Sequence, residues 1–326
     1  MATRNLVTQM TALEVARRSS NPDAFTIIET MAMSNTMLQE LPVIEANDGA
    51  IHTSVVRRSY PGGEHRVYNQ GVGAKASQTD TVQDVIAMLE AFSDVDERLA
   101  AHSGNPKALY QSEAQAFLIG MGIDQAHDLI YGNHTNPAEI NGLAVRYSKV
   151  GKHCLNFGGA GSNLTSVYLV AAGPQACHLI YPKGSSSVGV KREDLGVNRV
   201  KDSSDENKTF MAHTDHFIAE YGIAIAHPDA VIRIANIPVN LTQQQRADLI
   251  ELILRNQKKL TKGIVNTVLF ANEDIIYQIE RAGRELQTVV FSEADPWGKP
   301  VANINGMRFR AQDAILSTEK SSDLAA

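Results

Sequence analysis

The sequence predicts an α+β protein built from two lobes, and three features of the chain lead to this prediction. Residues 105–131 meet the requirements of one long helix, and a protruding hairpin is expected at residues 51–77. Further along, short apolar stretches rich in β-branched residues alternate with amphipathic stretches, which is typical of strands covered by helices. The predicted strands are residues 164–172, 178–181 and 231–237, and the predicted helices are residues 243–260 and 273–284.

The composition limits the classes of protein to which the chain can belong. With 326 residues and 35.4 kDa it is long enough for two domains, and its formal charge of -6 argues against a dedicated nucleic-acid binder. The two cysteines, Cys154 and Cys177, have neither pairing nor ligand spacing, so we expect a reducing, cytosolic environment. No stretch resembles a signal peptide or approaches membrane-spanning length, and we therefore expect a soluble protein.

Residues 1–50 are predicted to form an arm rather than a domain. Short helices are expected at residues 8–18 and 24–39, separated by Asn21-Pro22-Asp23 and ended by Pro42. Two short helices bury little surface on their own. We therefore expect their apolar faces to dock on the rest of the chain or on a neighbouring chain.

The hairpin of residues 51–77 is predicted from two polar strand-like stretches around a turn. Residues 52–60 and 64–72 flank Pro61-Gly62-Gly63, and few apolar residues lie on either face. An isolated two-stranded hairpin is only marginally stable in water. Its charged side chains either protect an exposed edge or lie along another subunit, and the sequence leaves both interpretations open.

Residues 78–101 fit two descriptions. Their apolar spacing allows a helix, yet the threonines and β-branched residues also allow a strand that leads into a short helix from Asp94. Propensity alone does not decide between them.

The long helix of residues 105–131, which we call the spine helix, has clear local signals at both ends. Asn105 is a suitable N-cap, Pro106 occupies the first helical position, and Gly132 follows the last apolar residue. Gly120 and Gly122 lie in its middle, where each costs about 1 kcal/mol relative to alanine. We therefore expect another part of the chain to approach the helix backbone closely there.

The remaining segments are read from polarity and periodicity. Residues 182–208 are polar and are predicted to be loops. Residues 286–291 and 306–316 are predicted to be strands that return to the first lobe.

A search for catalytic or cofactor motifs finds none that is complete. The glycines of residues 158–161 lack the third glycine of a dinucleotide site, and Pro182-Lys183-Gly184-Ser185 lacks the order of a P-loop. His213, Asp215 and His216 could bind a metal, although surface or interface polar residues are the preferred interpretation. We therefore predict no catalytic, cofactor or metal residues. A small basic cluster is best explained as a solvated helix end rather than a DNA contact, and consists of Arg255, Lys258, Lys259 and Lys262.

Several longer motifs identify a known family. They are SNTMLQELPVIEANDG, YPGGEHRVYNQGVGAKAS, SEAQAFLIGM, YGN with NGLAVRY, LIYPKGSSSVGVKREDLG and GIAIAHPDAVIRIANI. In this order they resemble the major capsid protein of short-tailed bacteriophages related to epsilon15 and Bordetella phage. The resemblance runs from about residue 25 to the final predicted strand. One departure is His65, which precedes Arg66 where related proteins favour an aromatic residue.

The resemblance implies the HK97-like coat-protein fold of tailed phages. It divides the chain into an N-terminal arm, an extended loop, a peripheral domain with the spine helix, an axial domain, and return strands of the peripheral domain with a C-terminal tail. It also favours a strand over residues 78–92. The corresponding ranges are 1–50, 51–77, 78–144, 145–285 and 286–326.

The resemblance further implies a protein that assembles with copies of itself, through pentamers and hexamers, into an icosahedral shell around double-stranded DNA. The expected location is the virion capsid, assembled in the host bacterial cytoplasm. Expected partners are a portal protein, scaffolding and cement or decoration proteins, and the packaged DNA, which is held non-specifically; no membrane and no cofactor are expected. The candidate contacts between subunits are Arg57, Arg58, Arg66 and Lys75, paired with acidic residues of a neighbour's spine helix or arm.

Two other functions remain as alternatives. A two-lobed α/β enzyme would carry convergent titratable groups with perturbed pKa values in one pocket. An encapsulin-like nanocompartment shell would share the fold but enclose a host cargo. We see no reason to expect covalent crosslinking, and Asn69 and Lys75 are interpreted as ordinary polar loop residues.

Overall fold

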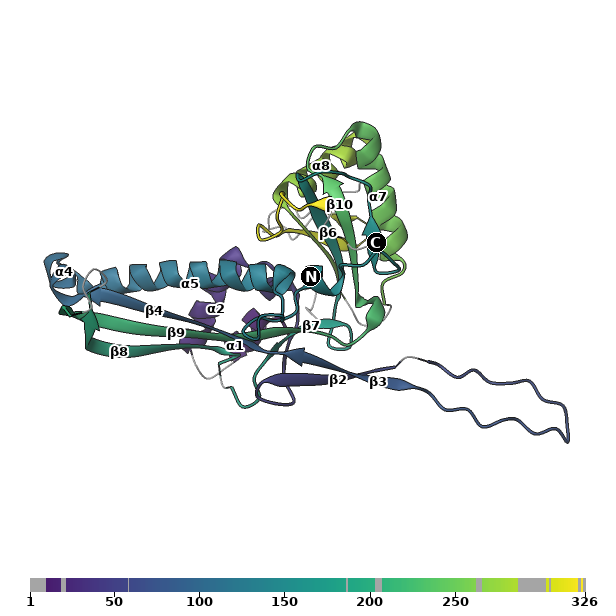
Figure 1. Ribbon diagram of the computed structural model, residues 1–326, viewed down its shortest axis with the longest axis horizontal. Coiled ribbons are helices and arrows are strands. Elements are labelled where there is room, and N and C mark those ends of the chain that lie inside the picture. Colours follow the sequence, from purple (N-terminus) through teal and green to yellow (C-terminus); the bar gives the residue numbers. More distant parts are fainter. Residues whose placement is uncertain are drawn as a thin grey trace, which may run out of the picture.

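The chain forms an elongated lobe, a second compact lobe at one end of it, and a long loop that projects away from both (Figure 1). The computed structural model describes residues 10–18, 22–57, 59–185, 187–202, 207–261, 266–286, 303–304, 306–321 and 324.

The spine helix organises the elongated lobe, as predicted. It is α5 (Pro106–Tyr131), and the Asn105 side chain accepts a hydrogen bond from the backbone N–H of Ala108. At the other end, the N–H of Gly132 donates to the carbonyl oxygen of Asp128 at 2.9 Å. The helix lies along a sheet of three long strands, β4 (Ala87–Asp96), β9 (Thr209–Ile225) and β8 (Val190–Lys201), with β9 in the middle.

Residues 78–101 form strands followed by a short helix, which confirms the interpretation favoured by the resemblance. β3 (Thr79–Val85) leads into β4, and α4 (Glu97–His102) follows directly. Asp96 caps this short helix, because its carboxylate accepts from the backbone N–H groups of Arg98 and Leu99.

The N-terminal arm docks on the chain's own spine helix. Its helices are α1 (Ala12–Arg18), α2 (Pro22–Ser34) and α3 (Met37–Glu40), with α2 packed against α5. The single helix predicted at residues 24–39 is wrong, because Asn35 interrupts it: the Asn35 side chain accepts from the N–H of Met37 and restarts the chain as α3.

One of the two glycines in the spine helix is explained by this docking. A Cβ at Gly122 would lie 2.8 Å from the carbonyl oxygen of Met31 in α2, whereas a Cβ at Gly120 would meet nothing within 4 Å. The expected close approach is therefore confirmed at Gly122 and wrong at Gly120.

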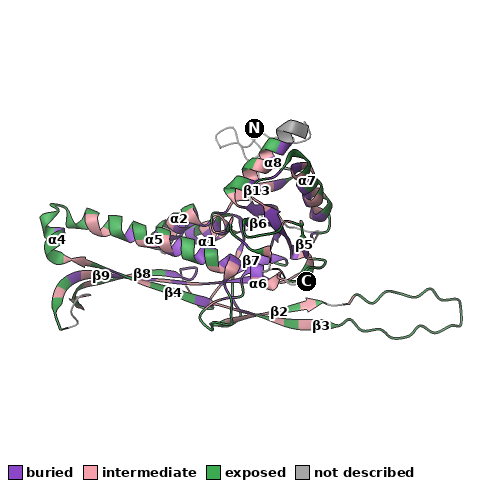
Figure 2. Cartoon of the chain, turned by 45° about the horizontal axis from the view of Figure 1, so that its top comes forward, coloured by how far each residue is buried: buried purple, intermediate pink, exposed green. Residues whose placement is uncertain are grey.

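The projecting hairpin uses different strands from those predicted. β2 (Ile51–Arg57) pairs antiparallel with β3, from Ile51 opposite Val85 to Arg57 opposite Thr79. The stretch 64–72 has no strand, and residues 60–79 are exposed throughout, so the tip is a long open loop (Figure 2). The predicted turn at Pro61-Gly62-Gly63 is wrong, because the chain turns at Val67–Gln70, where the N–H of Gln70 donates to the carbonyl oxygen of Val67 at 3.1 Å.

The second lobe is built on a sheet whose central strands are β6 (Leu164–Ala172) and β10 (Val231–Pro238), both close to fully buried. Outward from them lie β5 (Cys154–Asn156), β11 (Asn266–Ala271), β13 (Met307–Ala311) and the short β12 (Asn303–Ile304). Helices α7 (Gln243–Gln257) and α8 (Glu273–Leu286) belong to this lobe (Figure 1). Shorter elements are α6 (Leu143–Arg146) and the 3-10 turn η1 (Pro228–Ala230).

The two lobes share strands. The last residues of β9 pair with β7 (Cys177–Tyr181), which in turn pairs with the N-terminal strand β1 (Val43–Glu45) and touches the end of β6. Burial is concentrated where these strands meet (Figure 2).

Strand pairing corrects three sequence predictions. The polar stretch 182–208 was predicted to be loop, but it contains β8, an edge strand that is exposed at most positions. Exposed edge strands are polar, so polarity alone did not distinguish this strand from a loop. Strand β8 and residues 209–221 of β9 lie in the sheet along the spine helix, within a range that was predicted to be axial. Residues 307–311 do not return to the first lobe but pair with β11 in the second. The predicted strand at 286–291 lies almost wholly outside the described residues.

Candidate assembly surfaces

The projecting loop carries the four predicted contact residues, which differ in the contacts they make within their own chain. Arg57 ends β2 and is exposed, and the Arg66 guanidinium donates to the carbonyl oxygen of Gln70 at 3.4 Å. Lys75 Nζ lies 2.5 Å from Glu64 Oε1, an ion pair that ties the two arms of the loop together. Arg58 lies outside the described residues.

The same loop exposes large apolar side chains that its own chain does not cover. Tyr60, Val67 and Tyr68 are 74%, 67% and 94% exposed. Over residues 57–77 the sequence has four arginines and lysines against one carboxylate, Glu64. The loop is therefore both basic and partly apolar, and is poorly matched to water on its own.

The sheet beside the spine helix has one face turned away from that helix, which we call the outer face. On β9, Phe217 stacks near Phe117 of α5 and Tyr221 donates to Asp128, so odd-numbered residues face the helix and even-numbered ones face outward. The pairing extends this rule to the neighbouring strands. The outer face consists of Met88, Glu90, Phe92 and Asp94 of β4, Thr214, His216, Ile218 and Glu220 of β9, and Lys191 and Glu193 of β8.

The outer face is acidic and carries exposed apolar side chains. It holds four carboxylates and one lysine, and Met88 and Phe92 are 57% and 53% exposed. Burial and the neighbouring Glu90 raise the pKa of Glu220. A shallow hollow of about 560 Å³ runs between Met88, Glu90 and Glu220 and the loop that begins at Pro182.

Of the three metal candidates weighed in the sequence, His213 and Asp215 lie together and His216 lies apart from them. His216 lies on the outer face, where it stacks on Phe92 at 4.2 Å. His213 and Asp215 lie on the opposite face beneath α5, because neighbouring residues of a strand point to opposite sides. His213 stacks there on Tyr110 with ring centroids 4.1 Å apart.

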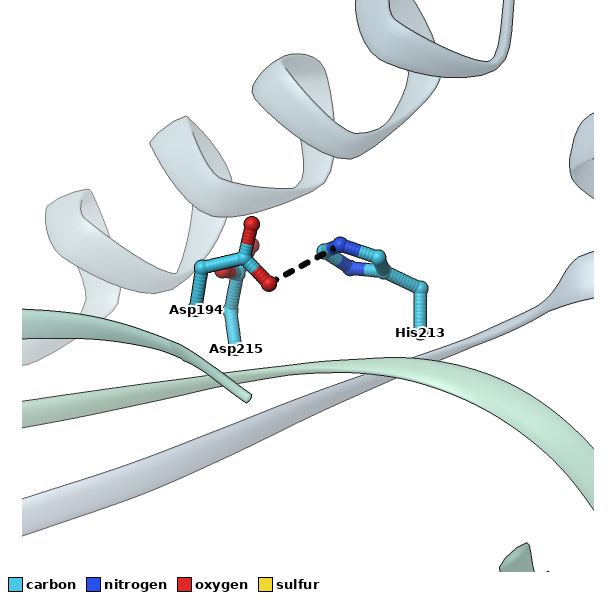
Figure 3. Close-up of side chains that lie close together, drawn as sticks. All are labelled: Asp194, His213 and Asp215. Carbon is cyan, nitrogen blue, oxygen red and sulfur yellow. Dashed lines mark ion pairs between the residues drawn. The ribbon is translucent and has the colours of Figure 1, made fainter. Parts of the chain in front are cut away.

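The structure adds Asp194 to His213 and Asp215, and the three ligand atoms lie within 4.8 Å of one another (Figure 3). His213 Nε2 is 3.1 Å from Asp194 Oδ1. The Asp215 carboxylate, however, already receives the Arg192 guanidinium at 2.7 and 3.4 Å. A cation at this point would be repelled by Arg192, so we interpret the cluster as an ion-pair network that joins β8 to β9.

The remaining motifs singled out in the sequence have structural explanations. Gly158 and Gly161 have φ angles of +98° and +107°, and the glycine stretch leads into a strand rather than into a helix N-terminus that could bind phosphate. Gly184 donates its N–H to Glu45 at 2.7 Å. Arg255 is exposed in the last turn of α7, as expected of a solvated helix end, and Lys262 lies outside the described residues. Within the described chain no helix has the length and apolarity needed to cross a membrane.

Sequence reasoning missed a buried polar cluster where the two lobes join, which we call the C-terminal clamp. Glu319 accepts from Tyr131 of the spine helix at 2.6 Å and from Ser166 of β6 at 2.5 Å. Arg233 of β10 reaches the same carboxylate at 3.2 Å. The only signal in the sequence was a charged residue inside the apolar run VIRIANI, which requires a buried partner.

Comparison with known proteins decides the family. The family model described as "Major capsid protein GP7" matches residues 19–322. The chain belongs to this family. It is therefore a shell-forming structural protein of the virion capsid of a tailed phage, and the resemblance seen in the sequence is confirmed.

One solved structure supports the fold, and two more distant ones are also similar. A capsid structure of bacteriophage Epsilon15 is similar over 87% of this chain and 88% of that chain, with 24% identity and a TM-score of 0.63. The bacteriophage JBD30 capsid covers 86% and 91% at 12% identity and a TM-score of 0.49. The SrpI encapsulin of Synechococcus elongatus PCC 7942 covers 63% and 88% at 11% identity and a TM-score of 0.45. No match is found among curated proteins. The capsid protein has the HK97-like fold, and its family favours a phage shell over a nanocompartment.

Proposed function

We propose that the capsid protein assembles through pentamers and hexamers into an icosahedral shell that encloses double-stranded DNA, formed in the host cytoplasm around a portal protein. Its formal charge of -6 suits a wall that confines DNA without gripping it. Scaffolding and cement or decoration proteins are compatible with this role. We assign it no catalytic activity: in the described part of the chain, the titratable groups clustered beneath the spine helix, Asp194, His213 and Asp215, are already committed to ion pairs.

The observation that carries the proposal is that one chain has both an exposed basic loop and an acidic outer face. We infer that the loop of one subunit lies across the outer face of its neighbour. Arg57, Arg58 and Arg66 then approach carboxylates such as Glu90, and the loop's apolar side chains cover Met88 and Phe92. Lys75 holds the two arms of the loop together through Glu64 and adds its charge to the contact. Repetition around a ring makes each modest contact effectively intramolecular.

Reversing the charge of Arg66 tests this contact. The Arg66→Glu variant is expected to lose closed shells or to form misdirected aggregates, because a carboxylate would face the acidic outer face of the neighbour. Shells and their sedimentation are scored by electron microscopy and ultracentrifugation. Normal particles from Arg66→Glu would contradict the proposal.

A compensating exchange identifies the partner face. Glu90→Arg alone is expected to impair assembly, and the double variant Arg66→Glu, Glu90→Arg is expected to restore part of it. Arg66→Lys keeps the charge and serves as the conservative control, and Lys107→Glu reverses an exposed charge on the spine helix. If no exchange of an outer-face carboxylate rescues Arg66→Glu, the partner of Arg66 lies on another surface.

A further inference from the structure

The root of the projecting hairpin is held against the body of the protein by two buried polar contacts. Asp84 of β3 is 1% exposed, and its Oδ1 lies 2.6 Å from Nη1 of Arg146 in α6. Arg146 is itself fixed, because it donates to the carbonyl oxygens of Asn141 and Ile223 at 2.7 and 3.2 Å. This ion pair connects the hairpin to the lobe junction.

The second contact is a pair of histidines. His52 of β2 lies opposite Asp84 in the hairpin, and its ring meets that of His178 of β7 edge to face, with centroids 5.7 Å apart. His178 is 2% exposed and neither of its ring nitrogens has a hydrogen-bond partner; Nδ1 of His52 is likewise buried and unpaired. One imidazole therefore moves with the hairpin and the other belongs to the sheet of the body.

Among the described residues packed around His178, none is placed to stabilise a charge on its ring. Asp84 already pairs with Arg146. Cys177 and Tyr147 lie close to that ion pair. Burial raises the pKa of both groups, to about 12 for Cys177, so both stay neutral. The adjacent residues of β9, from Gly222 to Ile225, carry no titratable side chain. Glu45 of β1 lies near Tyr181, whose pKa its charge helps to raise.

Burial and the facing His52 lower the pKa of His178 to about 4; the Gly173 backbone opposes this without completing a hydrogen bond. This lowered pKa makes the attachment of the hairpin weaker in acid. A histidine whose pKa is lower in the closed state than in the open state favours the closed state fully above about pH 6.5, and loses that effect as the pH falls toward 4.

We propose that the His52–His178 pair is a pH-dependent latch for the projecting hairpin: neutral imidazoles hold its root against β7, and protonation releases it so that the loop can change direction. The Asp84–Arg146 ion pair is the permanent half of the attachment and acts as the pivot. The proposal rests on the proposed function in which the loop reaches a neighbouring subunit, and it adds a way to regulate that reach.

Hydrogen–deuterium exchange of the unassembled full-length chain tests the latch. After division by intrinsic exchange rates, protection of amides in β2 and β3 is expected to fall about thirtyfold between pH 8 and pH 5. The His178→Gln variant, whose side chain does not titrate, should show no such fall. Exposed His134 supplies the matched control, and His134→Gln should behave like the unaltered chain.

Internal references make the result decisive. Amides of α5 and β9 should keep their protection over the same pH range, and an equal loss there would mean global unfolding and would overturn the latch. An undiminished fall in His178→Gln would also overturn it. If that variant does not fold, His52→Gln provides a second test, with a smaller fall expected because the facing imidazole is gone. These measurements need no assembly, so failure of the loop contact with a neighbour would leave them unchanged.

Discussion

Replacement of Arg233 by methionine is expected to destabilise the capsid protein by about 3–5 kcal/mol, because it leaves the buried Glu319 carboxylate without its cation. The side chains of both residues are 5% exposed. Arg233 also donates to Ser166 at 3.1 Å and to the carbonyl oxygens of Ala144 and Tyr147 at 3.0 and 3.2 Å. The substitution therefore unpairs acceptors from several segments at once.

The C-terminal clamp is a bridge between lobes, so its loss should affect both. Glu319 receives Tyr131 from the end of the spine helix, and the backbone N–H of Leu316 donates to the same Tyr131 hydroxyl at 3.0 Å. Burial, with Tyr168 and Glu319 nearby, raises the pKa of Tyr131, so the hydroxyl keeps the proton that it donates. Urea unfolding followed by both far-ultraviolet circular dichroism and tyrosine fluorescence would measure the loss.

Two further variants separate charge burial from packing. The double variant Arg233→Met, Glu319→Gln removes both charges, so no unpaired charge stays buried. We therefore expect it to be more stable than Arg233→Met by at least about 1 kcal/mol. Arg308→Met is the control, since Arg308 pairs at 3.5 Å with Glu40 but is 43% exposed, and should cost about 1 kcal/mol or less. Equal losses in Arg233→Met and Arg308→Met would contradict the special role of the clamp.

The parts of the fold that the sequence predicted are those determined by neighbouring residues. The spine helix has an N-cap, a first-turn proline and a stop within its own segment, and β6 and β10 are apolar throughout. β8 was missed because an edge strand buries little and so shows no apolar pattern. The hairpin register was wrong because β2 pairs across a loop much longer than a turn motif spans.

The functional sites depended on contacts that sequence reasoning could not see. Glu319 meets Tyr131 and Ser166 across separations of 188 and 153 residues. His213 and His216 were grouped because they are close in sequence, yet strand alternation puts them on opposite faces. His52 and His178 carry no motif at all. The basic loop was recognised correctly as a surface feature, while the acidic outer face required the register of β4, β8 and β9.

Gly122→Ala and Gly120→Ala are expected to change stability in opposite directions, although both put the same methyl group on the same helix. At Gly122 the new Cβ would lie 2.8 Å from the carbonyl oxygen and 3.1 Å from Cα of Met31. These atoms belong to the backbone of α2, so the arm would have to move away from the spine helix, at a cost of about 1–3 kcal/mol. Nearby Ser34, whose hydroxyl reaches the carbonyl oxygen of Ile119 at 3.2 Å, would also lose its place.

At Gly120 the methyl group would enter open space, and alanine should stabilise the helix by about 0.5–1 kcal/mol. The two variants are compared by thermal unfolding. Helix propensity predicts stabilisation at both positions, so it cannot explain a destabilisation at Gly122. Destabilisation at Gly122 alone would show that the arm is held on its own subunit's spine helix in solution. Stabilisation at both positions would mean that α2 leaves the spine helix readily, and the arm would then be free to dock on a neighbouring subunit.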